Sequence, residues 1–232
     1  MLVVKQAEIG VVMPNWCYTN MEVRGDEEVL DRFVAELKHN AVKVGDPNIS
    51  LNDLFPVPDE LCVRSGFFGN NDDGTPSVLQ LEMEAVYAAN RAKLGHQDWY
   101  SWAIVNWGTK WGACRPEMDR VADDVLCINF ESAWSPADEL IRHISKMFPD
   151  LLFACSYTEE SEAFVGWEVF LNGSGGQGFA TDEQLASVMN LHPDGAEWTP
   201  EISDAMSDMR GNIEMGLADD MEKFIVEFTD KL

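Results

Sequence analysis

The sequence predicts an α+β fold, in which an antiparallel sheet carries helices on one face. The first observation is the order of the patterns between Trp16 and Leu171, which runs strand, helix, strand, helix, strand, strand. The second is an acidic turn between the last two strand patterns, which favours a hairpin and therefore an antiparallel sheet in a two-layer arrangement. The third is a long helical pattern after Gly173, which predicts a C-terminal helical appendage.

The first predicted unit is a strand followed by a helix. Residues Trp16 to Arg24 alternate between apolar and polar types, as expected of a strand with one buried face. Gly25 and Asp26 precede a run with helical spacing, so the helix is expected to begin there. The apolar positions of that run are Val29, Leu30, Phe33, Val34 and Leu37.

The middle of the chain mixes loops with one further helix. Three prolines within residues 45–59 predict a loop, because proline interrupts regular structure. The Gly-, Asn- and Asp-rich stretch 64–75 is a second predicted loop. Thr75 and Pro76 then favour the start of a helix to about Lys93, since proline suits a first helical position. This helix is expected to be an insertion, near 75–95, in the sheet domain.

The second half of the predicted sheet follows. Val125–Glu131 has a strand pattern, and Ser135-Pro136 opens a helix that runs through Met147. Leu151–Tyr157 and Phe164–Leu171 are two more expected strands. Because an acidic turn separates them, they should pair as a hairpin.

The region after residue 172 is expected to be separate from the sheet. Residues 173–178 fit the spacing G-x-G-x-x-G after a strand, but the helical pattern begins only near Thr181. A dinucleotide site needs the helix to open on the glycines, so we expect a flexible break instead. A short helix to Leu191 and a long one from Thr199-Pro200 follow. Gly211 and Gly216 predict a kink in the latter, or two helices.

These patterns divide the chain into three predicted parts. Met13-Pro14 reads as a second start, so residues 1–12 are expected to be an N-terminal extension. Residues 13–172 form the α+β domain, and residues 173–232 form an acidic helical tail. The first residues lack the pattern of a secretory signal, and no run of 18 apolar residues is present, so we expect a cytoplasmic protein.

Charge is the strongest compositional signal. The formal net charge is −25, with 16 basic and 41 acidic residues. From Tyr157 to the C-terminus we count 17 acidic and three basic residues. Such a surface repels nucleic-acid backbones and anionic membranes and suits a basic protein partner. Solubility alone is the alternative explanation. The five cysteines include no C-x-x-C pair, so neither a disulfide framework nor a metal or iron–sulfur site is expected.

Three strings resemble a known family. They are Met13–Asn20 (MPNWCYTN), Trp99–Trp111 (WYSWAIVNWGTKW) and Phe130–Pro136 (FESAWSP). Together they look like the YubB-like, ferredoxin-fold proteins of bacteriophages, plasmids and prophages, over about Met13 to Asn172. The resemblance implies a ferredoxin-like sheet, no iron–sulfur cluster and no catalytic residues to carry over, because the family's function is not established. The tail after Gly173 lies outside it.

The tryptophan-rich strings hold the candidate site. Four tryptophans fall within thirteen residues between Trp99 and Trp111. We expect a ligand- or partner-binding site in the loops that flank the predicted strands, because aromatic faces beside a cation can stack a base or grip a peptide. Its predicted members are Trp107, Lys110, Trp111, Trp134 and Ser135. The alternative is that these tryptophans bury against the sheet and join the two motifs. The methionines of the tail, Met206, Met209, Met215 and Met221, have the same two explanations, partner surface or core.

No pattern predicts catalysis or a cofactor. His39, His96, His143 and His192 are isolated, the loop Asn70–Gly74 lacks EF-hand spacing, and no nucleophile or Walker string occurs. The leading hypothesis is a non-enzymatic, acidic accessory protein of a mobile element that binds a basic host protein, such as a defence or nucleic-acid-binding factor. The alternatives are a nucleotide or other small-molecule binder or enzyme using the tryptophan cluster, and a structural or assembly protein. The sequence leaves the oligomeric state open.

Overall fold

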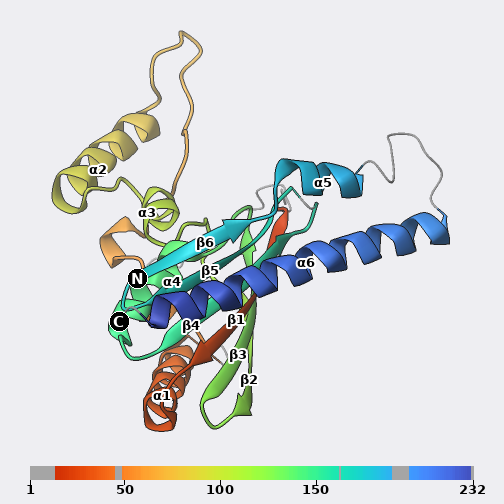
Figure 1. Cartoon of the computed structure of the whole chain (residues 1–232). Helices are drawn as coiled ribbons and strands as arrows, with labels where there is room; N and C mark the ends of the chain where they lie inside the picture. Colours follow the sequence, from red (N-terminus) through yellow and green to blue (C-terminus); the bar gives the residue numbers. More distant parts are fainter. Residues whose placement is uncertain (1–13, 45–48, 162, 190–198, 231–232) are drawn as a thin grey trace.

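A six-stranded antiparallel sheet organises the protein, in the order β2-β3-β1-β4-β5-β6. The computed structural model describes residues 14–44, 49–161, 163–189 and 199–230. Its strands are β1 (Trp16–Arg24), β2 (Cys114–Ala122), β3 (Val125–Ala133), β4 (Leu152–Glu159), β5 (Val165–Leu171) and β6 (Ser174–Phe179). Its helices are α1 (Glu27–Val44), α2 (Val78–Leu94), α3 (Trp99–Asn106), α4 (Asp138–Met147), α5 (Asp182–Met189) and α6 (Pro200–Thr229). This architecture, drawn in Figure 1, confirms the predicted α+β class.

The first four strands and two helices form a ferredoxin-like unit. In chain order they run β1, α1, β2, β3, α4, β4, and in space the strands lie in the order β2-β3-β1-β4. This is the split βαββαβ topology. Strands β5 and β6 extend it beyond β4 as an antiparallel meander, so the sheet continues through Phe179.

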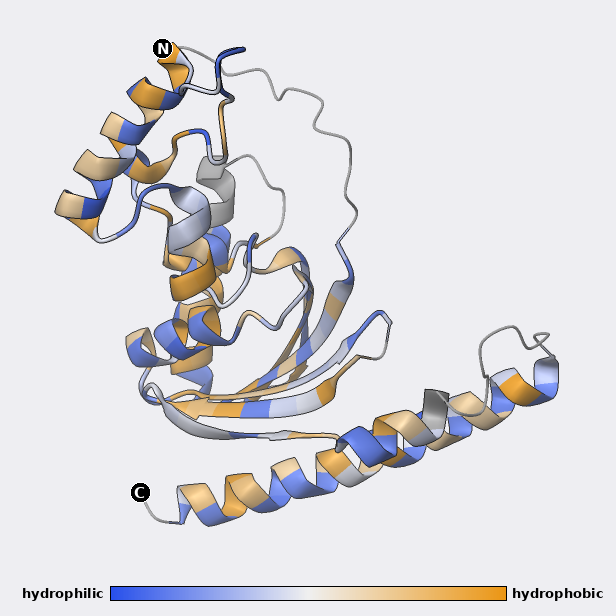
Figure 2. Ribbon diagram, turned by 90° about the horizontal axis from the view of Figure 1, so that it is seen from above, coloured by the Kyte–Doolittle hydropathy of each residue, from blue (hydrophilic) through white to orange (hydrophobic). Residues whose placement is uncertain are grey.

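The helices α1 and α4 cover one face of the sheet, which we call the inner face (Figure 2). Alternation along β1 sends Met21 and Val23 inward, where both are fully buried. They meet Leu30 and Phe33 of α1 in the larger core cluster. Helix α1 begins where Asp26 accepts a hydrogen bond from the backbone N–H of Glu28, at 3.0 Å.

The opposite, outer face is covered by α6 over part of its width (Figures 1 and 2). Trp167 and Val169 of β5 point outward and pack with Ile213, Leu217 and Ile225 of α6 in a second, smaller cluster. Over β1 and β3 the outer face carries polar side chains instead, as the next subsection describes.

A helical insertion lies between α1 and β2. Helix α2 begins at Val78, where the Ser77 hydroxyl accepts from the Gln80 N–H at 3.1 Å, close to the predicted start. Helix α3 follows, capped by the buried Asp98. Trp102 of α3 joins the inner core, whereas α2 stands away from the sheet in Figure 1.

Two strands contradict the sequence interpretation. Strand β2 was not predicted, because Pro116 and several charged residues remove the usual pattern; its place at the sheet edge explains why proline is tolerated. The predicted flexible break at residues 173–178 is wrong, since β6 pairs with β5 along its length. Its glycines serve close packing: a side chain at Gly176 would collide with the Phe224 ring, and one at Gly178 with Trp167.

The predicted kink in the last helix is also wrong. Helix α6 runs unbroken for 30 residues. Each glycine costs about 1 kcal/mol against alanine, but Ile213 and Leu217 are buried next to them and anchor the helix on the sheet. Packing therefore outweighs propensity. The predicted extension 1–12 lies outside the described residues, and no described helix is long and apolar enough to cross a membrane.

Candidate functional site

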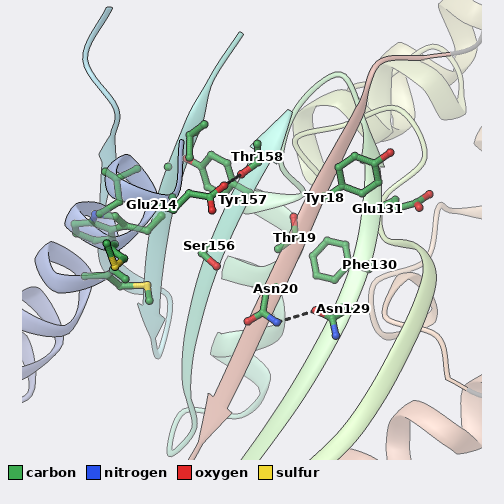
Figure 3. Close-up of a pocket in the computed structure, with 18 of the residues that line it drawn as sticks. Tyr18, Thr19, Asn20, Asn129, Phe130, Glu131, Ser156, Tyr157, Thr158 and Glu214 are labelled. Carbon is green, nitrogen blue, oxygen red and sulfur yellow. Dashed lines mark hydrogen bonds between the residues drawn. The ribbon is translucent and has the colours of Figure 1, made fainter. Parts of the chain in front are cut away.

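A large groove lies between the open part of the outer sheet face and α6. Its volume is about 1280 Å³, and strands β1 to β5 all contribute to its floor. Figure 3 shows polar side chains across that floor, with Glu214 of α6 at the side. The uncharged polar side chains that face outward on this floor are those of Tyr18, Asn20, Asn129, Ser156 and Thr158.

Strand alternation explains why this floor is polar. Thr19 and Met21 of β1 point into the inner core, so Tyr18 and Asn20 must point outward. Asn20 pairs with Asn129 across β1 and β3. Its side-chain amide donates a hydrogen bond to the side-chain oxygen Oδ1 of Asn129 at 2.7 Å (Figure 3). The floor therefore presents amide and hydroxyl groups to whatever enters the groove.

The charged residues of the groove are mostly acidic. Glu117 comes from the edge strand β2 and Glu131 from its neighbour β3, and Asp208 and Glu214 come from α6. Arg115 is the single basic residue that lines the described groove, and it forms an ion pair with Glu131. The lining therefore keeps a negative excess. The α6 wall also offers apolar surface, because Met215 is 62% exposed.

The predicted site residues separate into two groups. Trp107 is buried at the end of α3, not in the flank of a strand, and its indole N–H donates to the Phe55 carbonyl at 2.8 Å. The Ser135 hydroxyl donates to the Gly108 carbonyl at 2.8 Å, which joins the two loops. Both residues have architectural contacts. Neither the groove nor the smaller hollow beside it is lined by any of the five predicted residues.

The other three predicted residues meet on the surface. The rings of Trp111 and Trp134 lie 5.7 Å apart, centroid to centroid. The Lys110 ammonium sits 4.9 Å and 5.3 Å from their centroids. Sequence spacing alone missed two neighbours. Trp16 lies 5.9 Å from Trp111, and the guanidinium of Arg115 lies 4.4 Å from the Trp16 ring. We call these five residues the aromatic ledge.

The backbone of Trp134 is in an unusual conformation. Its φ of 65° is in the left-handed region, which a bulky residue rarely adopts. The Trp134 N–H donates to the Asn15 carbonyl at 2.9 Å, and the Ser132 hydroxyl donates to the Ser135 carbonyl at 2.7 Å. These bonds hold the turn although the side chain remains 41% exposed.

A buried carboxyl lies under the inner face, away from the groove. Glu168 of β5 is 5% exposed, and burial together with the nearby Asp138 raises its pKa to about 8. Burial likewise raises the pKa of Asp138 above its ordinary value. Within the described part of the chain, no three His, Cys, Asp or Glu residues gather in a way that could hold a metal ion. His143 instead stacks on Phe55, with ring centroids 3.5 Å apart.

Comparison with known proteins bears on the fold. Residues 106–190 match a family model described as a ferredoxin-like domain in Api92-like protein. The match spans β2 to α5 and includes all five predicted site residues, while β1, α1 and α6 lie outside it. It supports a ferredoxin-like domain; the narrower resemblance to YubB-like proteins stays a prediction.

One solved structure is similar to the chain at a low level. It is the crystal structure of a protein api92 from Yersinia pseudotuberculosis, with 11% sequence identity and a TM-score of 0.43. The similarity covers 73% of this chain and 99% of that one. No curated protein matches the chain.

Proposed function

We propose that the protein is a non-enzymatic binding protein whose acidic groove takes a basic segment of a protein partner. The observation that carries this proposal is the groove between the open sheet face and α6, with its negative excess. Its volume of about 1280 Å³ exceeds the roughly 300–1,000 Å³ typical of small-molecule sites. That size favours a chain segment over a small ligand.

Charge supports the same partner. The whole chain carries −25, and α6 alone holds eight acidic and two basic residues. A field of this sign speeds the approach of a cationic partner and disfavours a nucleic-acid backbone. The amides and hydroxyls of the groove floor can hydrogen-bond to the backbone of an extended segment, and Met215 offers an adaptable apolar contact.

The proposed biological setting rests on sequence resemblance. The resemblance of three sequence strings to YubB-like proteins supports an origin on a phage, plasmid or prophage. An accessory protein of that origin would act in the bacterial cytosol on a host factor, such as a defence or nucleic-acid-binding protein. Such factors carry the basic segments that the groove would bind.

The proposal is tested with a labelled peptide of about twelve residues that alternates lysine and serine, long enough to span the groove when extended. Fluorescence anisotropy should show binding that weakens as salt rises from 50 to 300 mM, since screening shortens the range of the charges. The double variant Asp208→Asn/Glu214→Gln should weaken binding about threefold to tenfold, through loss of two charges near the ligand.

The matched control is Asp219→Asn/Asp220→Asn. These two residues are exposed on the same helix but do not line the groove. The control removes the same net charge, so a general field effect would weaken binding equally in both variants. Equal weakening would place the peptide elsewhere, and absence of binding at low salt would refute the proposal.

A further inference from the structure

The aromatic ledge is exposed but belongs to neither described hollow. Trp134 is 41% exposed, and Trp16 and Trp111 are partly buried. Small planar ligands normally bind in concave pockets, where most of their surface is buried. Tryptophan is instead one of the residue types that most often anchor protein partners.

The backbone strain at Trp134 indicates that the ring's position has a use. A left-handed φ at a bulky residue costs about 1 kcal/mol or more, and the Trp134 turn is held by hydrogen bonds from several segments. The core does not need this arrangement, because Trp134 belongs to neither buried cluster. Backbone strain that does not contribute to core packing is most often found at binding sites.

The ledge already binds cations of its own chain. The Arg115 guanidinium lies over Trp16, and the Lys110 ammonium lies over Trp111, Trp134 and Tyr100, at 5.8 Å from the last. These contacts demonstrate the interaction mode that the rings favour, attraction of a cation by the ring face. Guanidinium is the better partner for an exposed ring, since it is planar and weakly hydrated.

The ledge and the groove are continuous. Arg115 lines the groove and stacks on Trp16, and ring-to-ring steps of 5.9 Å and 5.7 Å lead from Trp16 through Trp111 to Trp134. Because an extended chain advances roughly 3.3 Å per residue, about four residues of a segment would reach from the groove's end to Trp134.

We propose that Trp134 anchors an arginine of the partner's basic segment, by stacking against its guanidinium. This inference rests on the proposed function and adds to it a preference for arginine over lysine at one position. Lys110 is the resident cation of the ledge, so it repels the incoming guanidinium and limits the affinity. The ledge therefore selects the partner, while the groove supplies most of the electrostatic attraction.

The experiment compares two peptides of about twelve residues, one alternating arginine and serine and the other lysine and serine. We expect the wild type to bind the arginine peptide about twofold to fivefold more tightly, the range of one cation–π contact at an exposed site. Trp134→Gly should abolish that preference and leave lysine-peptide binding unchanged. Glycine accepts the left-handed backbone, so this variant should fold; circular dichroism and thermal unfolding verify this.

Two further variants test the charge at the ledge and provide a control. Lys110→Met keeps most of the side chain's volume and removes its charge, so binding of the arginine peptide should tighten. If it weakens, Lys110 supports binding instead of opposing it, and the proposal is overturned. Phe67→Leu, at an aromatic residue that is 71% exposed and absent from the ring contacts of the ledge, should change nothing.

The pattern of failures separates the two proposals. If neither peptide binds, the proposed function itself fails. If both bind with equal affinity, or if Trp134→Gly weakens both equally, the groove remains as proposed and the arginine anchor is refuted.

Discussion

The two faces of the sheet differ in how completely their packed residues are buried. On the inner face the core residues Leu30, Phe33 and Phe153 are fully buried. On the outer face the α6 residues that pack on the sheet, Ile213 and Leu217, are each still 9% exposed. The inner face is closed by α1 and α4 over most of its area, whereas the outer face is closed only where α6 lies. The difference suggests that the inner face stabilises the fold and that the outer face is shared between stability and binding.

The largest predicted effect tests the inner face. Phe153 is fully buried and packs edge-on against Phe33, at 5.6 Å between centroids. Phe153→Ala should lower the free energy of unfolding by about 3–5 kcal/mol, through lost burial and the cavity that remains. That is a large share of the roughly 5–15 kcal/mol typical of domains. Denaturant unfolding followed by circular dichroism measures it.

The matched change on the outer face is Ile225→Ala. Ile225 is 6% exposed and packs in the smaller cluster. We expect a loss of about 2 kcal/mol, seen mainly as faster hydrogen exchange along α6, because α6 can open locally while the sheet stays folded. If Ile225→Ala accelerated exchange in β1 as much as in α6, the two faces would form one cooperative unit and the comparison would fail.

The sequence predicted the inner face well, for a physical reason. The alternation along β1 and the helical spacing of α1 both arise because one face of each element is buried against the same core. Such periodicity is the most reliable sequence signal. Strands β2 and β6 show no clear alternation of apolar and polar residues. β2 lies at an edge, where Pro116 and the charged residues around Met118 obscure its partly buried face, and β6 is glycine-rich because Phe224 and Trp167 pack against it. These determinants lie in residues distant in sequence, so a local pattern does not reveal them.

The candidate site shows the same limit. The sequence pattern placed Trp107 and Trp111 in one cluster because they are only four residues apart. The chain turns between them, however, and the turn separates their side chains. The turn buries Trp107 against Phe55 and leaves Trp111 among Trp16 and Trp134. The groove was not predicted at all. It arises where α6 crosses the sheet, and its lining combines residues from six separate elements.

The next prediction concerns Glu168, a buried carboxyl on the otherwise apolar inner face of β5. Glu168 faces Asp138, Glu139 and Arg142 of α4, and its register partner on β4 is Cys155. Its pKa is raised to about 8, chiefly by burial. An acid with a raised pKa keeps its proton in the folded state after the unfolded state has lost it, so stability falls as pH rises from about 4.5 to 8.

Glu168→Gln removes this ionisation and keeps the shape. Between pH 5 and pH 9 the wild type should lose about 1–3 kcal/mol more stability than the variant. Paired denaturant titrations at both pH values measure the difference. Parallel pH profiles for the two proteins would show that Glu168 reaches water when the protein is folded, and that the inner face is open near β5.

The smallest predicted effect sharpens the account of the outer face. Arg24 of β1 donates to both carboxylate oxygens of Glu222 on α6, at 2.6 Å and 3.2 Å, and also pairs with Glu22. Its contact lowers the pKa of Glu222. A double-mutant cycle of Arg24→Gln and Glu222→Gln should give a coupling of about 0.5–1 kcal/mol that shrinks at high salt, because the pair is partly exposed. A coupling near zero at low salt would mean that apolar packing alone holds α6 over the sheet. In that case the width of the groove would depend on Ile213, Leu217 and Ile225, and the ion pair would only set the register of α6 against β1.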